Sequence, residues 1–189
     1  MSADLPFPTA AAFVVDPFVP ATTLSVTWPG SAPLTNGVEL TPTAVAAQPA
    51  VSLGAGSGLY TLILSDPDAP NPGSPEFAEW QHWRVVNAPA ADLAAGDVRC
   101  AYFGSAPGQG AGVHRYVLVA YAQPGGARIA VDDAANPPIS ATSGFAPRRS
   151  FDSRAYAARH GLVPVAAITW RAQWDAMVPE LAKKLTATA

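Results

Sequence analysis

Short apolar runs separated by turn residues make up most of this chain. Two of them, Leu59–Leu64 and Tyr116–Tyr121, are rich in branched and aromatic residues and are too short for free-standing helices. Because polar residues do not alternate through them, we expect both to be central strands that are buried on two faces. Weaker patterns predict strands at Trp83–Val86, Arg128–Val131 and Val165–Trp170. The chain is therefore predicted to be mostly β, with its strands in one sheet or in two packed sheets.

A tight turn is predicted near the beginning of the chain. The dipeptide Asn36-Gly37 suits the positive φ angles that such a turn requires. It lies between Leu24–Trp28 and Val38–Leu40, two segments with the character of strands. We therefore expect these two segments to pair with each other as a β-hairpin.

Two helices are predicted in the last part of the chain. Ser150 or Asp152 can cap a helix that runs through Arg154–Arg159, and Gly161 is well placed to end it in a left-handed conformation. A second helix is expected near the C-terminus, because apolar residues recur there at helical spacing and a proline occurs where only the first turn tolerates it. The residues concerned are Val178, Pro179, Leu181 and Leu185.

The organisation expected from length and composition is one globular domain, residues 1–189. A chain of 189 residues with 49% hydrophobic residues can supply a sizeable core. Its 20 prolines and 15 glycines favour strands joined by loops over long helices. Residues 124–149 contain Gly-Gly, Asp-Asp and Pro-Pro pairs, so we expect a long loop there with at most one short strand. Residues 1–12 are expected to be a flexible N-terminal segment.

Charge and cysteine content narrow the classes of partner. Lysine and arginine total 11 against 14 acidic residues, and the basic residues are scattered, so nucleic acid is not an expected partner. No apolar stretch approaches the roughly 20 residues that span a bilayer, and peripheral contact with a membrane is the most that we expect. The N-terminus lacks the basic region of a signal peptide, and Cys100 is the single cysteine. A cytoplasmic location is therefore predicted.

The first candidate for chemistry is a turn that carries two carboxylates. Asp66 and Asp68 directly follow the apolar strand, and Pro67 and Pro70 stiffen the segment as it leaves the sheet. Such a turn holds both aspartates in set directions. Asp and Pro are also ordinary turn residues, so a purely structural role, in which the carboxylates bind nearby backbone groups, remains open.

Two histidines stand at the beginnings of strands. His82 follows Trp80 by two residues and His114 precedes Tyr116 by two, so each histidine shares one face of its strand with an aromatic residue. A polar group on an apolar floor is typical of a small-ligand pocket. The alternative is that each histidine is a buried, hydrogen-bonded structural residue. The repetition favours one shared site.

The residues argue against a metal, a cofactor and a covalent mechanism. Two histidines and two aspartates are a plausible ligand set, but no pair has the tight spacing of common metal motifs. There is no G-x-S-x-G segment, and no activating group adjoins Cys100. The glycine-rich stretch 104–112 lacks the lysine of a phosphate-transfer loop, although its backbone N–H groups can still meet an anion. We therefore expect no cofactor and no metal.

Several segments in order resemble a known family. DPDAP, then W-x-H-W-R-V-V-N, then G-S-x-P and G-x-H-R-Y-V are similar to the two signature regions of the phosphatidylethanolamine-binding proteins. That family includes Raf kinase inhibitor proteins, plant flowering-locus-T-like proteins and the yeast carboxypeptidase Y inhibitor. The resemblance covers roughly Phe13 to Leu185 and includes the expected C-terminal helix.

The resemblance implies a fold and a site. The fold would consist of two antiparallel β-sheets with a few short peripheral helices, including a C-terminal one. The site would accept a small anionic or phosphorylated group, and the bond before Pro70 would be a candidate for the cis form. One carboxylate would favour a protonated histidine, and the second would be free for a cationic amine. The implied ligand-binding residues are Asp66, Asp68, Pro70, Trp80, His82, Gly104, Ser105, Pro107, His114 and Tyr116.

The implied function is a regulatory or inhibitory protein that binds a ligand and a protein partner, such as a kinase, a serine carboxypeptidase or a signalling complex. An alternative is an enzyme that uses Asp66, His82 and His114 for acid–base chemistry on an anionic small molecule, as in natural-product dimerisation or cyclisation. A third is an inert pocket on a protein that acts through its surface. Gln81 and Ala182 stand where animal members carry a second histidine and a tyrosine, which argues against phosphatidylethanolamine itself as the preferred ligand.

Overall fold

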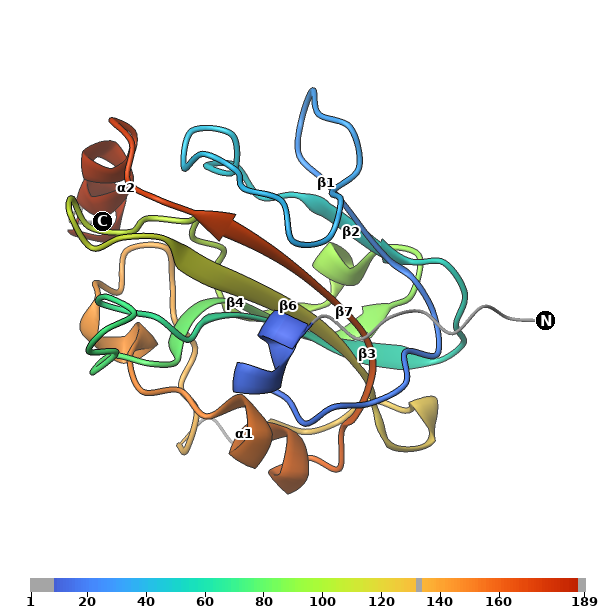
Figure 1. The fold of residues 1–189 in the computed structure, drawn as a ribbon. Coiled ribbons are helices and arrows are strands. Elements are labelled where there is room, and N and C mark those ends of the chain that lie inside the picture. Colours follow the sequence, from blue (N-terminus) through green and yellow to red (C-terminus); the bar gives the residue numbers. More distant parts are fainter. Residues whose placement is uncertain (1–8, 132–133, 187–189) are drawn as a thin grey trace.

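The computed structural model describes residues 9–131 and 134–186, and these form seven strands and two α-helices (Figure 1). The helices are α1 (Ser153–Arg159) and α2 (Val178–Thr186), and short 3-10 turns include η1 (Thr9–Phe13), η2 (Leu93–Ala95), η3 (Pro124–Gly126) and η4 (Ala146–Arg148). The strands are β1 (Leu24–Thr27), β2 (Ala50–Leu53), β3 (Leu59–Asp66), β4 (Trp80–Pro89), β5 (Asp97–Cys100), β6 (His114–Ala122) and β7 (Val163–Ala172).

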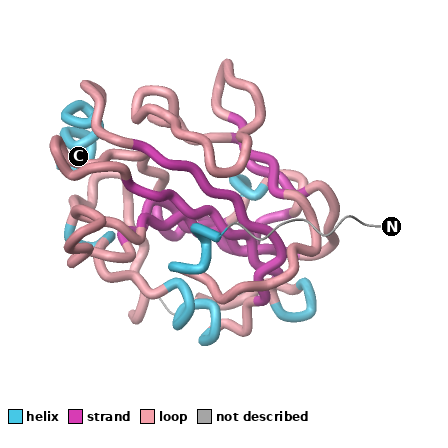
Figure 2. The backbone as a smooth tube through the Cα atoms, viewed as in Figure 1, coloured by secondary structure: helices cyan, strands magenta, loops and turns pink. Residues whose placement is uncertain are grey.

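The strands form two antiparallel sheets, as the resemblance implied. The larger sheet has the order β5-β4-β3-β6-β7, and the smaller one consists of β1 and β2. Figure 2 shows the strands at the centre of the molecule with the helices at its periphery. The predicted fold class, mostly β with two antiparallel sheets and a C-terminal helix, is therefore confirmed.

Both faces of the large sheet are covered, which is why its middle strands are apolar without alternation. Leu62 and Leu64 of β3 pack in a core shared with the small sheet, where Val26 and Val51 are buried. Ile63, between them, points to the other face, into a cluster formed with the N-terminal segment and α1. The prediction that the runs in β3 and β6 are central strands buried on two faces is confirmed.

The predicted hairpin is wrong, because Leu24–Trp28 and Val38–Leu40 do not pair with each other. Gly37 does adopt a positive φ of 78° in a turn, but β1 pairs with β2 rather than with Val38–Leu40. The segment Val38–Leu40 lies instead along β7, where the N–H of Leu40 donates to the carbonyl of Arg171 over 2.8 Å. A tight turn specifies a change of direction, whereas the partner strand is chosen by long-range packing.

A second strand prediction is also wrong, and two strands were missed. Arg128–Val131 is not a strand; the N–H of Ile129 donates to the side chain of Asn87 over 2.9 Å instead of joining a ladder. The missed strands, β2 and β5, have only four residues each, which is too short for a clear pattern. The strands at Trp83–Val86 and Val165–Trp170 are present and longer than predicted.

The two predicted helices are present. Asp152 rather than Ser150 caps α1, because its carboxylate accepts from the N–H of Ala155 over 2.8 Å. Gly161 follows the helix with a φ of 61°, in the left-handed region. Leu181 of α2 is buried, as the helical spacing required.

The loop and terminal predictions concern regions that the structure describes in part. In the described part of residues 124–149 there is no strand, only η3, η4 and an isolated bridge from Cys100 to Ile139. Of the segment 1–12 predicted to be flexible, residues 1–8 lie outside the described residues, and the remainder belongs to η1. Among the described helices, none has the length and apolarity needed to cross a membrane.

Candidate functional site

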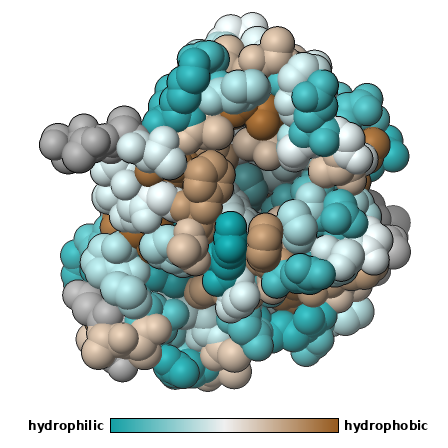
Figure 3. All heavy atoms as spheres, turned by 90° about the vertical axis from the view of Figure 1, so that its left-hand side faces the viewer, coloured by the Kyte–Doolittle hydropathy of each residue, from teal (hydrophilic) through white to brown (hydrophobic). Residues whose placement is uncertain are grey.

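A cavity of about 320 Å³ opens at the end of the large sheet nearest α2. Its walls come from segments far apart in the sequence: the end of β3, the beginnings of β4 and β6, the loop that contains η4, and one face of α2. Figure 3 shows this end of the molecule, where the surface is hollowed and apolar side chains lie beside polar ones. The lining residues are Asp66, Ala69, Pro70, Phe77, Trp80, His82, Phe103, Ala106, Gly108, His114, Phe145, Arg149, Val178 and Ala182.

An aspartate and a histidine in the lining of this cavity are paired. Because β3 ends at Asp66 and the neighbouring strand β6 begins at His114, the antiparallel register brings their side chains together. The distance from His114 Nδ1 to Asp66 Oδ2 is 2.7 Å, and both side chains are buried. Burial raises the pKa of Asp66 above its ordinary value, although the hydrogen bond from His114 opposes this effect.

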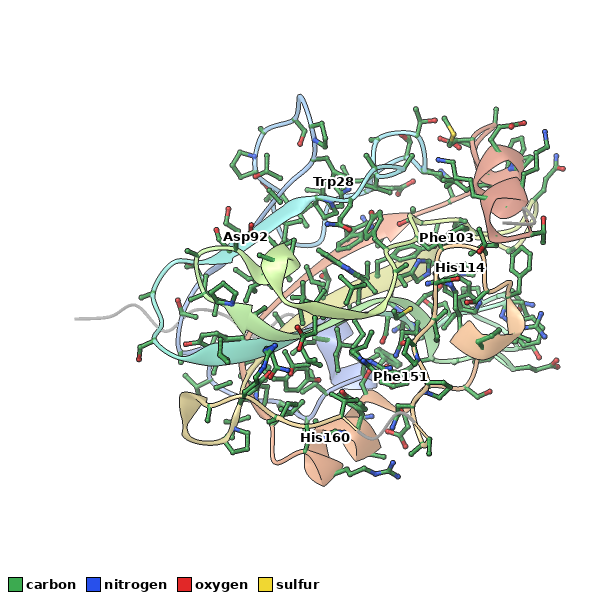
Figure 4. All side chains as sticks on the ribbon, turned by 180° about the vertical axis from the view of Figure 1, so that it is seen from behind. Trp28, Asp92, Phe103, His114, Phe151 and His160 are labelled. Atoms are coloured by element: carbon green, nitrogen blue, oxygen red, sulfur yellow. The ribbon has the colours of Figure 1, made fainter. Side chains whose placement is uncertain are left out.

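The second ring nitrogen of His114 has no partner among the described residues. His114 is only 2% exposed, and its Nε2 makes no hydrogen bond. A buried polar atom without a partner is unfavourable, typically by about 1–3 kcal/mol. Because the ring lines the cavity, beside Phe103 in Figure 4, Nε2 is the polar atom that it offers to a ligand.

His82 lies near this pair and is held by a backbone carbonyl. Its Nδ1 lies 2.8 Å from the carbonyl oxygen of Phe103 and donates to it, and its ring packs 4.3 Å from that of Trp80 between centroids. Burial, together with the positive charge of Arg148, lowers the pKa of His82 to about 3. His82 is therefore neutral near pH 7.

Asp68, the second predicted carboxylate, does not line the cavity. It accepts hydrogen bonds from Arg115 at the backbone N and at Nε, both over 2.8 Å, and forms an ion pair with the same guanidinium. Burial raises the pKa of Asp68, but the bonds from Arg115 outweigh this, and the pKa lies below its ordinary value. The expectation that Asp68 is free for a cationic amine is wrong, because Arg115 already satisfies it.

Four more of the predicted residues support the cavity from behind without lining it. Tyr116 stacks on Trp170 at 5.7 Å and meets the edge of His82 at 5.1 Å between ring centroids. Ser105 accepts a hydrogen bond from the indole of Trp170 over 3.0 Å. Gly104 lies so close to the backbone that a Cβ there would be 2.6 Å from the carbonyl oxygen of Val45. Pro107 is buried between the lining residues Ala106 and Gly108.

The other five predicted residues do meet at the cavity: Asp66, Pro70, Trp80, His82 and His114. The bond between Ala69 and Pro70 is cis, as the resemblance suggested. The aromatic residues Phe77, Phe103 and Phe145 also line the cavity and were not predicted. Their positions within loops gave no periodic signal, so the tertiary structure was needed to find them.

Two adjacent arginines have separate roles at the cavity. Arg149 is exposed, lines the cavity, and places its guanidinium 3.8 Å from the ring centre of Phe77. Arg148 is fully buried and donates to the carbonyls of Gln81 and Ala101 over 3.1 and 3.0 Å. Its guanidinium also lies 5.3 Å from the ring centre of Trp80. The sequence shows two adjacent arginines, but only the structure shows that Arg148 is buried and that Arg149 is exposed.

The described residues of the cavity show no arrangement typical of covalent or metal chemistry. Among the described residues, no three histidine, cysteine, aspartate or glutamate side chains gather as a metal site requires. Cys100 is buried away from the cavity lining, and burial raises the pKa of its thiol to about 11, which suppresses the reactive thiolate. The polar groups that the described lining offers include Nε2 of His114, the guanidinium of Arg149 and the carboxylate of Asp66, and the rest of the wall is largely apolar.

Comparison with known proteins agrees with this architecture. The chain is 40% identical over 163 residues to the Oryza sativa subsp. japonica protein named Protein MOTHER of FT and TFL1 homolog 2, covering 85% of this chain and 86% of that one. It is 39% identical over 164 residues to CEN-like protein 1 of Nicotiana tabacum, again covering 85% and 86%.

A solved structure shares the fold. The carboxypeptidase Y inhibitor, crystallised in complex with its cognate proteinase, superposes with a TM-score of 0.69 over 88% of this chain and 91% of that chain, at 23% identity. The model of the family described as phosphatidylethanolamine-binding protein matches residues 34–157. These matches agree with the motifs around Asp66, His82 and His114, and the chain belongs to the phosphatidylethanolamine-binding protein family.

Proposed function

We propose that this protein binds a small anionic or phosphorylated ligand in the cavity, without catalysis, and that ligand binding regulates its contact with a protein partner. The observation that carries the proposal is the Nε2 atom of His114, which is buried in the cavity wall and has no partner among the residues 9–131 and 134–186. An anion that accepts a hydrogen bond from the protonated imidazole would satisfy it. Arg149 supplies a second positive charge at the edge of the same cavity.

The binding half of the proposal is tested with inorganic phosphate. We expect His114→Ala and Arg149→Ala each to weaken phosphate binding by about tenfold, since a hydrogen bond to a charged group contributes about 1.5–3 kcal/mol. Arg159→Ala is a matched control, because Arg159 is exposed at the end of α1 and does not line the cavity. Titration calorimetry that showed equal affinity for all four proteins would reject this site.

A protein partner is supported by the relatives. The carboxypeptidase Y inhibitor forms a complex with its cognate proteinase. On this chain, Phe145 both lines the cavity and is 38% exposed, so a ligand below it would alter the surface that a partner meets. A kinase, a serine carboxypeptidase or a signalling complex is the class of partner that we propose, in a cytoplasmic location that the single cysteine suits.

The regulatory half has its own test. If the ligand orders the edge of the cavity, hydrogen exchange of the backbone N–H groups in residues 145–149 should slow when phosphate is added. The exposed strand β5 is a suitable internal reference, since Asp97 and Val98 lie outside the cavity lining. Equal exchange in residues 145–149 with and without saturating phosphate would remove the link between ligand and surface.

An enzyme is the second candidate, and one observation favours it. A histidine oriented by a carboxylate at Nδ1, with Nε2 left for a substrate, is the arrangement of a general base. Among the described residues that line the cavity there is no serine, threonine, cysteine or lysine, so we expect proton transfer rather than a covalent intermediate. Turnover of polyketide-like acids or anhydrides that both His114→Ala and Asp66→Asn abolish would replace the non-catalytic proposal.

A further inference from the structure

The charged groups around the cavity are paired with one another in a way that disfavours ligands with an ammonium group. Asp66 is the one carboxylate among the described residues that line it, and its Oδ2 accepts from His114 while its Oδ1 accepts from the backbone N–H of Asp68 over 2.7 Å. Asp68 itself is held by Arg115. Each oxygen of the one carboxylate in the described lining therefore already has a partner within the protein.

Three aromatic rings of the lining, the other usual partners of an ammonium group, already have a guanidinium group near them. The guanidinium of Arg149 lies over the ring of Phe77 at 3.8 Å, and that of Arg148 lies 5.3 and 5.6 Å from the rings of Trp80 and Phe103. These two cations already interact with three of the aromatic rings in the lining. A third cation placed there would be repelled by both guanidinium groups.

The remaining wall is apolar. Val178 and Ala182 stand four residues apart on α2, so they share one face of the helix, and that face lines the cavity opposite the sheet. Phe145 and Ala106 extend the same apolar surface. The volume of about 320 Å³ corresponds to about ten water molecules, whereas a phosphate has only five non-hydrogen atoms. A phosphate alone would leave much of the apolar wall in contact with water.

We infer that the preferred ligand is a phosphomonoester that carries an apolar, ring-sized group and no amine, and that Ala182 helps to determine this preference. The inference rests on the proposed function and specifies its ligand class. The phosphate would meet His114 Nε2, and the apolar group would lie against Val178 and Ala182. An ethanolamine phosphate, whose ammonium finds no partner, would gain nothing over inorganic phosphate.

The test compares three probes by titration calorimetry at pH 6: inorganic phosphate, phenyl phosphate and phosphoethanolamine. Burial of a phenyl ring predicts that phenyl phosphate binds about tenfold or more tighter than phosphate. Phosphoethanolamine should bind no tighter than phosphate. Vesicles that contain phosphatidate present the same monoester on a lipid, and binding to them that exceeded binding of phenyl phosphate would reject the ring-sized group.

A substitution on α2 locates the apolar part of the ligand. Ala182→Trp places an indole ring where the apolar group of the ligand would lie. The ratio of the phenyl phosphate affinity to the phosphate affinity should therefore fall towards one. Thr186→Trp is the matched control, because Thr186 is exposed on the same helix and does not line the cavity. It should retain the ratio of the unaltered protein.

The outcomes separate the inference from the proposal on which it rests. If phosphate binds but phenyl phosphate binds no tighter, or phosphoethanolamine binds tightest, the ligand class is wrong while the anion site stands. If none of the three probes binds, the anion site itself is wrong. Should Ala182→Trp fail to fold, the three affinities of the unaltered protein still decide the ligand class.

Discussion

The imidazole of His114 lies 2.7 Å from the carboxylate of Asp66 through Nδ1, and Nε2 has no partner in the part of the chain that the structure describes. The two residues are 48 positions apart in the chain, and they meet because one ends β3 where the other begins β6. The pairing combines a buried negative charge with a nitrogen that can carry a proton towards a ligand. Its charge state is therefore the first property to test.

Phosphate binding between pH 6 and pH 8 should not place a proton on His82, because burial disfavours the charged imidazole. The protein should take up no more than one proton for each phosphate bound. The pKa of His82 is about 3, so His82 stays neutral throughout this range. Calorimetry in buffers of different ionisation enthalpy measures this number. Uptake of two protons by the protein would put charge on His82 and contradict the structure.

Acid should destabilise the fold through His82. Its pKa is about 3 when folded and about 6.5 when unfolded, so the unfolded state binds the extra proton. The contribution of His82 to stability is complete above about pH 6.5 and is lost as the pH falls towards 3, at about 1.4 kcal/mol per pH unit. Urea unfolding of His82→Leu between pH 6 and pH 4 should therefore show a shallower loss of stability than the unaltered protein. Identical slopes would mean that His82 is protonated in the folded state.

The two adjacent arginines should differ in stability measurements. Arg148→Met removes donors from buried carbonyls of Gln81 and Ala101, and an unsatisfied buried group costs about 1–3 kcal/mol. Arg149→Met changes an exposed side chain and should alter the free energy of unfolding by about 0.5 kcal/mol or less. Chemical denaturation of both variants measures the difference. Equal losses would show that Arg148 is not the structural member of the pair.

Gly104 should be required for the fold rather than for ligand contact. In Gly104→Ala the new methyl group would meet the carbonyl oxygen of Val45 at 2.6 Å, and that oxygen belongs to the backbone and cannot turn aside. We expect a loss of about 1–3 kcal/mol, as for other overpacked sites. Gly108→Ala is the control, since the nearest atom to its Cβ would be 3.9 Å away. A thermal melt in which both variants matched the unaltered protein would show that the Val45 segment yields easily.

Local sequence patterns determined the central strands, both α-helices and the residues at which polar side chains enter the site. The segments that form β3 and β6 are apolar on both faces. Asp152 marks the beginning of α1 and Gly161 follows its end, both through interactions within a few residues. Hydrophobic periodicity and helix capping depend on residues close together in the chain, so they can be predicted from the sequence alone. His82 and His114 were identified because each stands at the beginning of a predicted strand.

Tertiary structure alone decided which groups pair. The turn at Asn36-Gly37 leads its chain to β7, Asp68 turns to Arg115, and Arg148 is buried while Arg149 is exposed. Each choice depends on which distant strand or loop packs against the segment, and neighbouring positions in a chain face different surroundings once it is folded. Ionisation follows the same logic: burial, together with the charge of Arg148, lowers the pKa of His82, and both arise only when distant segments pack around it.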